Sequence, residues 1–185
     1  IAGEGAPQAV EAQRIVLATG ARPFAGSWAF DERSILSYRG LLSLSTLPKR
    51  LLIIGGGSIG CEFASCFSAF GTQVTVVEQQ PQLLPFEDPE AVRWLIRRLE
   101  ARGVSLRTGT TVRELTTSAD GMTATLSDGA QVAADRCLVA IGQRPNVESL
   151  QLPAAGVACG RGVTVDPYLR TNQPHIAAIG DCLEG

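Results

Sequence analysis

A short apolar run meets a cluster of glycines in the stretch Leu51-Leu52-Ile53-Ile54-Gly55-Gly56-Gly57-Ser58-Ile59-Gly60. The apolar part is typical of a buried strand, and small and apolar residues continue from Ser58 to Phe70 as in a helix. Gly71 suits the left-handed turn that ends a helix, and the β-branched run 73–78 follows it and ends in a carboxylate. The sequence therefore predicts strand, tight turn, helix and strand, a βαβ unit of about 30 residues.

A second helix is predicted to begin at Asp88-Pro89, where an acceptor side chain precedes a proline in the first helical position, and to end at Gly103. Four apolar residues recur at helical spacing and give it a buried side: Val92, Leu95, Ile96 and Leu99. We interpret its charged side as a solvated surface rather than an anion site, although it carries Arg93, Arg97, Arg98 and Glu100.

Shorter patterns fill the rest of the chain. Between Val104 and Val132 apolar and polar residues alternate, and Asp120-Gly121 and Asp128-Gly129 suit hairpin turns, which predicts a small antiparallel meander. Other short strands are expected from Arg14 to the turn Thr19-Gly20, over 137–141 as a buried parallel strand, and within 160–169 and 175–179. Residues 24–47 are irregular in pattern and are interpreted as a connecting segment.

Composition and charge limit the class of protein. The chain has 185 residues, of which 45% are apolar, and a formal net charge of −2, which is typical of one soluble globular domain with or without extra segments. No apolar run approaches the roughly 18 residues of a membrane span, and the first residues lack the pattern of a signal peptide. We therefore expect a cytoplasmic protein. Dispersed charges without a Lys/Arg run do not support nucleic-acid or membrane binding.

Cysteine and histidine usage indicates reduced thiols and no metal site. One histidine is present, His175, and the cysteines form no CxxC pair. The five cysteines are Cys61, Cys66, Cys137, Cys159 and Cys182.

The glycine turn and Glu78 together predict a dinucleotide site. Gly55 permits the turn, Gly57 lets the backbone approach a pyrophosphate, and Gly60 lets helix and strand pack closely. The helix N terminus offers N–H groups and a positive dipole to the phosphates. Glu78 lies 23 positions after Gly55, where its carboxylate can accept hydrogen bonds from ribose hydroxyls and would repel a 2′-phosphate. Because no Arg or Lys occurs between Glu78 and Arg93, the sequence predicts NAD rather than NADP.

Six motifs occur along nearly the whole chain: Ala18-Thr19-Gly20-Ala21-Arg22-Pro23, residues 55–62, Val76-Val77-Glu78, Leu84-Pro85-Phe86-Glu87-Asp88, Gly142-Gln143-Arg144-Pro145-Asn146 and Ala178-Ile179-Gly180-Asp181. In this order they resemble the pyridine nucleotide-disulfide oxidoreductase family, most closely its dihydrolipoamide dehydrogenase branch. The resemblance implies an α/β fold: a Rossmann-like βαβ parallel sheet with an inserted three-stranded antiparallel β-meander, flanked by partial flavin-domain strands.

The same resemblance implies a division of the chain. Residues 1–47 would be the C-terminal part of a first flavin-domain segment with a connector, residues 48–145 the NAD-binding domain, and residues 146–185 the return segment of the flavin domain. The chain begins with Ile1 rather than Met, and Gly185 follows directly on an expected strand and turn. We therefore expect both ends to be cut from a longer parent protein, a homodimer by the same resemblance.

Cofactor roles follow from the resemblance position by position. The residues expected at NAD are Gly55, Gly56, Gly57, Ser58, Ile59, Gly60, Glu62, Glu78, Val112, Ala140, Ile141, Gly142 and Gln143, and those expected at FAD are Thr19, Gly20 and Asp181. For Glu62 an exposed helix glutamate, and for Val112 a core valine, remain the alternatives. Two departures are Ser58, where several relatives carry an aromatic gate, and Gln143, where an arginine is usual.

Cys61 and Cys66 have the spacing of the family's redox disulfide, but they lie inside a predicted helix. An offset of five residues there gives about 7.5 Å of rise and about 140° of rotation, beyond the reach of an unstrained disulfide. We interpret them as small packing residues. His175 is interpreted as a loop histidine, because the family's acid–base histidine belongs to another domain. No catalytic residue is therefore expected in this chain.

The function expected of the parent is hydride transfer between NAD(H) and FAD, coupled to a disulfide or dithiol substrate with dihydrolipoamide as the first candidate. This chain alone is expected to bind NAD(H) without turnover. Two alternatives stay open: a NADH oxidase or transhydrogenase flavoprotein that lacks the redox disulfide, and a non-catalytic nucleotide-sensing module.

Overall fold

The computed structural model describes residues 9–118 and 121–184, so Asp120 of one expected hairpin turn lies outside the described residues. The chain divides into two compact units. The central unit comprises residues 23–142, and the flanking unit comprises, among described residues, 9–22 and 143–184. Over this described part, no helix combines the length and apolar character needed to cross a membrane.

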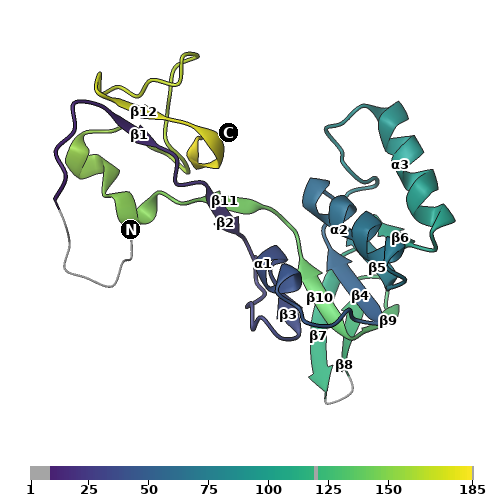
Figure 1. The fold of residues 1–185 in the computed structure, drawn as a ribbon. Helices are drawn as coiled ribbons and strands as arrows, with labels where there is room; N and C mark the ends of the chain where they lie inside the picture. Colours follow the sequence, from purple (N-terminus) through teal and green to yellow (C-terminus); the bar gives the residue numbers. More distant parts are fainter. Residues whose placement is uncertain (1–8, 119–120, 185) are drawn as a thin grey trace. The chain divides into compact units, whose positions relative to one another are not determined.

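The central unit is built on a five-stranded sheet in which every pairing is parallel. Its strands, in spatial order, are β3 (Ile35–Leu36), β10 (Arg136–Val139), β4 (Arg50–Ile54), β5 (Gln73–Glu78) and β6 (Ser105–Thr108). The predicted parallel sheet is thus confirmed, with the β4–turn–α2–β5 unit at its centre (Figure 1).

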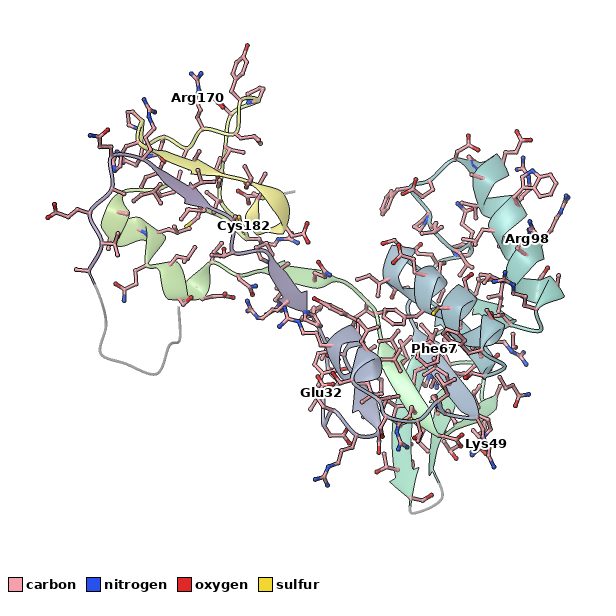
Figure 2. The ribbon with its side chains drawn as sticks, viewed as in Figure 1. Glu32, Lys49, Phe67, Arg98, Arg170 and Cys182 are labelled. Carbon is pink, nitrogen blue, oxygen red and sulfur yellow. The ribbon has the colours of Figure 1, made fainter. Side chains whose placement is uncertain are left out.

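Two helices cover one face of this sheet, α2 (Ser58–Ala69) and α3 (Pro89–Ala101). Phe67 of α2 and Leu99 of α3 are buried against apolar residues of β4 and β5, whereas Arg98 extends from the outer side of α3 (Figure 2). Asp88 caps α3 as predicted, because its carboxylate accepts the N–H groups of Glu90 and Ala91 at 2.8 and 3.0 Å.

A three-stranded antiparallel meander covers the other face, as predicted. It consists of β7 (Val112–Ser118), β8 (Gly121–Leu126) and β9 (Gln131–Ala134). Every second residue of β8 is buried, and these side chains pack against Leu52, Ile54 and Val77 of the parallel sheet. The sheet therefore carries apolar residues on both faces, which explains the continuous apolar runs of β4 and β10.

The structure corrects two predictions in this unit. Residues 105–108 were included in the alternating meander region but form β6, the edge strand of the parallel sheet. This edge strand packs the partly buried side chain of Leu106 against the core and exposes its neighbours, so it alternates like an antiparallel strand. Residues 24–47 are not wholly irregular. They include β3 and α1 (Tyr38–Leu42), whose first turn is capped by the Ser37 hydroxyl.

The flanking unit has two short ladders. β1 (Ile15–Leu17) pairs in parallel with β12 (Ile176–Ala178), confirming both predicted strands, and β2 (Ala21–Pro23) pairs with β11 (Gln143–Pro145). The remaining elements are 3₁₀ turns: η1 (Glu148–Leu150), η2 (Leu152–Ala155) and η3 (Gly180–Cys182). Figure 1 shows β1 and β12 side by side.

One strand predicted for the flanking unit is wrong. In the described residues of 160–169 there are only isolated bridges at Val163, to Cys159 and Leu183. The segment turns instead, because the Asp166 carboxylate accepts the N–H groups of Tyr168 and Arg170, both at 2.9 Å. Local side-chain acceptors of this kind compete with strand pairing.

Candidate dinucleotide-binding site

Three glycines of the turn between β4 and α2 differ in what a side chain at each position would meet. Gly55 has a left-handed φ of +111°, and a Cβ there would collide with the carbonyl oxygen of Ala140. A Cβ on Gly60 would collide with the carbonyl oxygen of Gly55, so helix and strand pack backbone to backbone. Gly57 is different, since a Cβ there would meet no atom within 4 Å. The turn is therefore closed on its protein side and open at Gly57.

The N terminus of α2 is left without a side-chain cap. Gly57 is its N-cap residue, and the described chain forms no side-chain cap hydrogen bond there. The first N–H groups of a helix lack intrahelical acceptors, and the helix dipole adds partial positive charge there. The open side of the turn and the open helix end coincide at Gly57 and Ser58, which is the arrangement that binds an anion.

Glu78 connects the end of β5 to this turn. Its carboxylate accepts the N–H of Gly56 through Oε2 at 2.6 Å and the N–H of Gln80 through Oε1 at 2.7 Å. Each carboxylate oxygen has a second lone pair. The carboxylate is thus held in place by backbone donors while retaining acceptor capacity for two hydroxyl groups.

Beyond Glu78 lies a polar hollow of about 460 Å³ at the end of β6. Its residues come from the end of β6 and from the β8–β9 turn: Leu106, Arg107, Thr108, Gly109, Thr110, Ser127 and Asp128. The N–H groups of Gly109 and Thr110 donate to the carbonyls of Gln80 and Glu78 at 2.8 and 3.2 Å, which joins the hollow to the end of β5. None of these residues was predicted from the sequence; the signal for them was Gly109, a glycine with φ +67° directly after a strand.

Val112 follows this hollow at the start of β7. Its side chain is partly buried against the apolar core under the meander, which agrees with the alternative of a core valine for the side chain. A contact of its backbone with a ligand stays a prediction.

On the opposite side of β4, the end of β10 meets the glycine turn. The Ala140 N–H donates to the Ile54 carbonyl at 2.8 Å, and Gly142 accepts from the Phe24 N–H at 3.0 Å. Ile141 between them is 41% exposed. Gln143 follows as the exposed first residue of β11. The structure thus brings Ala140 and Ile141 beside Gly55, and a contact of residues 140–143 with nicotinamide stays a prediction.

The first two turns of α2 carry the remaining expected residues. Ser58 and Glu62 are exposed and Ile59 is partly buried. No ion pair of Glu62 occurs among the described residues.

Cys61 of α2 contacts the glycine turn through a hydrogen bond. Its thiol is buried and donates to the Gly56 carbonyl at 3.4 Å. Burial, and then the negative charges of Glu78 and Glu62, raise the pKa of Cys61 to about 11, so the thiol stays neutral at physiological pH. Cys66 is exposed, and both cysteines are free, as predicted.

In the flanking unit, two of the sequence motifs hold each other. The Thr19 hydroxyl donates to the Asn146 carbonyl at 2.7 Å, and the Asn146 amide donates to the Thr19 carbonyl at 3.0 Å. Arg22 forms a two-point ion pair with Glu148, and this hydrogen bonding lowers the pKa of Glu148 to about 2. Two segments more than 120 positions apart are therefore fastened together.

The residues expected at FAD follow the ends of paired strands. β1 and β12 run in parallel, so Thr19-Gly20 and Asp181 follow their carboxyl ends on the same edge. The buried Cys182 thiol lies at this edge, 3.2 Å from the Ile179 carbonyl oxygen and 3.5 Å from that of Leu17, either of which can accept its single hydrogen. His175 is exposed before β12, and its carbonyl accepts the Ile15 N–H.

Comparison with known proteins bears directly on this arrangement. A family model described as pyridine nucleotide-disulphide oxidoreductase matches residues 2–185. The chain is 38% identical to a dihydrolipoyl dehydrogenase of Bacillus subtilis, covering 100% of this chain and 41% of the relative. It is also 38% identical to a soluble pyridine nucleotide transhydrogenase of Mycobacterium tuberculosis, covering 91% and 37%.

A solved structure shares the fold. The Cu(II) complex of the HOCl-induced flavoprotein disulfide reductase RclA from Escherichia coli superposes with a TM-score of 0.84 at 32% identity, covering 94% of this chain and 41% of that one. The chain thus spans about two fifths of the length of the proteins it matches. With the family model matched over almost every residue, this chain belongs to the pyridine nucleotide-disulphide oxidoreductase family.

Proposed function

We propose that the central unit binds NAD(H) across the carboxyl ends of β5, β4 and β10. The observation that carries this proposal is the Glu78 carboxylate held by the Gly56 N–H at 2.6 Å, beside a helix N terminus that no described side chain caps. The acceptors for a ribose and the donors for a pyrophosphate are thereby adjacent.

The residues fit this cofactor. The open side of Gly57 leaves room for phosphate oxygens at the backbone, and the N–H groups of Ser58 and Ile59 are the donors proposed for them. Glu78 would accept the ribose hydroxyls, and the hollow at the end of β6 would take the adenine with the backbone of Val112 beside it. Ala140, Ile141, Gly142 and Gln143 would border the nicotinamide, with Glu62 on the facing turn of α2.

We further propose that the whole protein passes a hydride between NAD(H) and FAD and exchanges electrons with a disulfide or dithiol. Dihydrolipoamide is the first candidate, since a relative is named dihydrolipoyl dehydrogenase. The two cofactors supply the hydride and electron chemistry when bound, and the chain's residues bind and orient them. Thr19, Gly20 and Asp181 are proposed at the flavin because they follow the carboxyl ends of β1 and β12. Residues 48–145 would then be the NAD-binding domain, with flavin-domain segments on either side.

A second candidate is a pyridine nucleotide transhydrogenase, because one relative carries that name at the same identity of 38%. Such a protein would exchange hydride between nucleotides and use no disulfide substrate. Two assays of the whole protein separate these candidate functions. A disulfide oxidoreductase should reduce lipoamide with NADH, whereas a transhydrogenase should reduce a NAD analogue with NADPH.

The nucleotide proposal is tested by titrating the chain with NADH and NADPH. NADH should bind about tenfold more tightly, because an anion at Glu78 opposes a 2′-phosphate. Glu78→Ala should weaken NADH about tenfold and remove this preference. Glu100→Ala, which removes an exposed carboxylate from the far part of α3, is the matched control and should change neither affinity. Equal affinities for the two nucleotides in the unsubstituted chain would contradict the role of Glu78.

A further inference from the structure

The turn at residues 24–28 lies beside Ile141 and Gly142, two of the residues proposed to border the nicotinamide. A role for this turn in ligand binding therefore rests on the proposed function. In the sheet, β5 and β10 lie on opposite sides of β4. A dinucleotide with one ribose at Glu78 and its phosphates at the N terminus of α2 must therefore extend its other half toward the end of β10. The first residues after β10 are Ala140, Ile141 and Gly142.

Ile141 presents an apolar side chain at that place, and its backbone is fixed on both sides. The residue before it donates to the Ile54 carbonyl at 2.8 Å, and the residue after it accepts the Phe24 N–H at 3.0 Å. With its backbone held and 41% of its surface exposed, Ile141 can vary chiefly in its side-chain rotamer.

The backbone of Gly26 lies beside the end of this side chain. Gly26 has a left-handed φ of +62°, in a turn closed by a 3.0 Å hydrogen bond from the Trp28 N–H to the Ala25 carbonyl. A Cβ on Gly26 would lie 2.8 Å from the Cδ1 atom of Ile141. Packed carbon atoms approach to about 3.5 Å, so any side chain at position 26 would displace the end of Ile141.

We propose that Gly26 is a positioning residue for the nicotinamide subsite. Its bare backbone seats Cδ1 of Ile141, and Ile141 in that rotamer gives the nicotinamide ring an apolar surface. The glycine acts through Ile141 and touches no part of the cofactor.

The test compares two ligands that differ only in the nicotinamide. The whole chain is titrated with NADH and with ADP-ribose, which has the same adenosine and pyrophosphate but no nicotinamide. Gly26→Ala should weaken NADH about fivefold and change ADP-ribose less than about twofold. Gly103→Ala is the matched control, because Gly103 has a similar left-handed φ of +81° with no atom within 4 Å of its Cβ position. It should leave the ratio of the two affinities unchanged.

A second substitution identifies the contact. Ile141→Val removes Cδ1, so adding it to Gly26→Ala should return NADH affinity to that of Ile141→Val alone. Circular dichroism checks folding, and if Gly26→Ala does not fold, Gly26→Asn places a Cβ at the same point with a residue that tolerates a left-handed backbone. Equal losses for NADH and ADP-ribose, or no rescue by Ile141→Val, would overturn the positioning role while the proposed function stands. No ADP-ribose binding by the unsubstituted chain would overturn both.

Discussion

The two long helices of the central unit begin in opposite ways. At α3 the Asp88 carboxylate accepts two N–H groups of the first turn, and Pro89 has no N–H to satisfy. At α2 the cap position is Gly57, and no described side chain caps the helix end. The hydrogen bonds of the Asp88 cap stabilise α3, whereas the uncapped start of α2 leaves its N–H donors available to a ligand.

Glutamate and aspartate have correspondingly different roles at the two helices. Asp88 serves the helix that follows it directly, while Glu78 reaches 22 positions back to the Gly56 N–H. The Gly56 bond lies just before the open helix end, so Glu78 fixes the glycine turn without filling it. A carboxylate near the start of a helix is therefore compatible with anion binding there only when it does not itself accept the first N–H groups of the helix.

The largest effect is expected from adding a side chain where α2 packs closely against the glycine turn, at Gly60. Gly60→Ala should lower the free energy of unfolding by about 2–4 kcal/mol, because its Cβ would collide with the Gly55 carbonyl and backbone must move. NADH affinity should fall at least about 100-fold, since the same movement displaces the phosphate donors. Chemical denaturation and NADH titration measure the two effects.

Gly71→Ala, at the other end of the same helix, is the control for this substitution. Gly71 has φ +86° and open space around its Cβ position, so alanine there should cost about 1 kcal/mol of strain and leave NADH affinity unchanged. If Gly60→Ala cost no more stability than Gly71→Ala, the close approach of helix and strand would not be needed.

An intermediate effect is expected where the turn is open. Gly57→Ala should leave the free energy of unfolding within about 0.5 kcal/mol of the original, because φ is −75° and a Cβ meets no protein atom. It should weaken NADH about tenfold by taking the space of the pyrophosphate. The two measurements are the same as for Gly60→Ala, and an unchanged NADH affinity would show that the phosphates bind elsewhere.

Local patterns were sufficient to predict much of this molecule. The β4–α2–β5 unit and the Asp88-Pro89 start of α3 follow from neighbouring residues, so sequence alone identified them. β6 and α1 were missed for another reason. An edge strand covered on one face alternates like a meander strand, and a five-residue helix depends on tertiary packing for its order.

The sequence alone points to the centre of the proposed site, but it gives little sign of the margins. The glycine spacing and Glu78 predict a dinucleotide turn because each residue type has a specific physical use in such a turn. The hollow at Gly109 and the contact of Gly26 with Ile141 depend on distances between segments far apart in the chain. A glycine in a loop is too common to indicate such a contact by itself.

The smallest effect is expected from removing the Asp88 cap of α3, the helix that contrasts with the uncapped α2. Asp88→Ala should lower the free energy of unfolding by about 1 kcal/mol, because two N–H groups lose their acceptor. NADH affinity should not change, since this end of α3 is satisfied by its own chain. Asp88→Asn keeps an acceptor oxygen and should recover most of the stability, which separates the hydrogen bonds from the lost charge. Denaturation curves and NADH titrations of both variants decide the matter. A loss of NADH affinity in Asp88→Ala with stability unchanged would mean that the capped helix end serves the ligand after all.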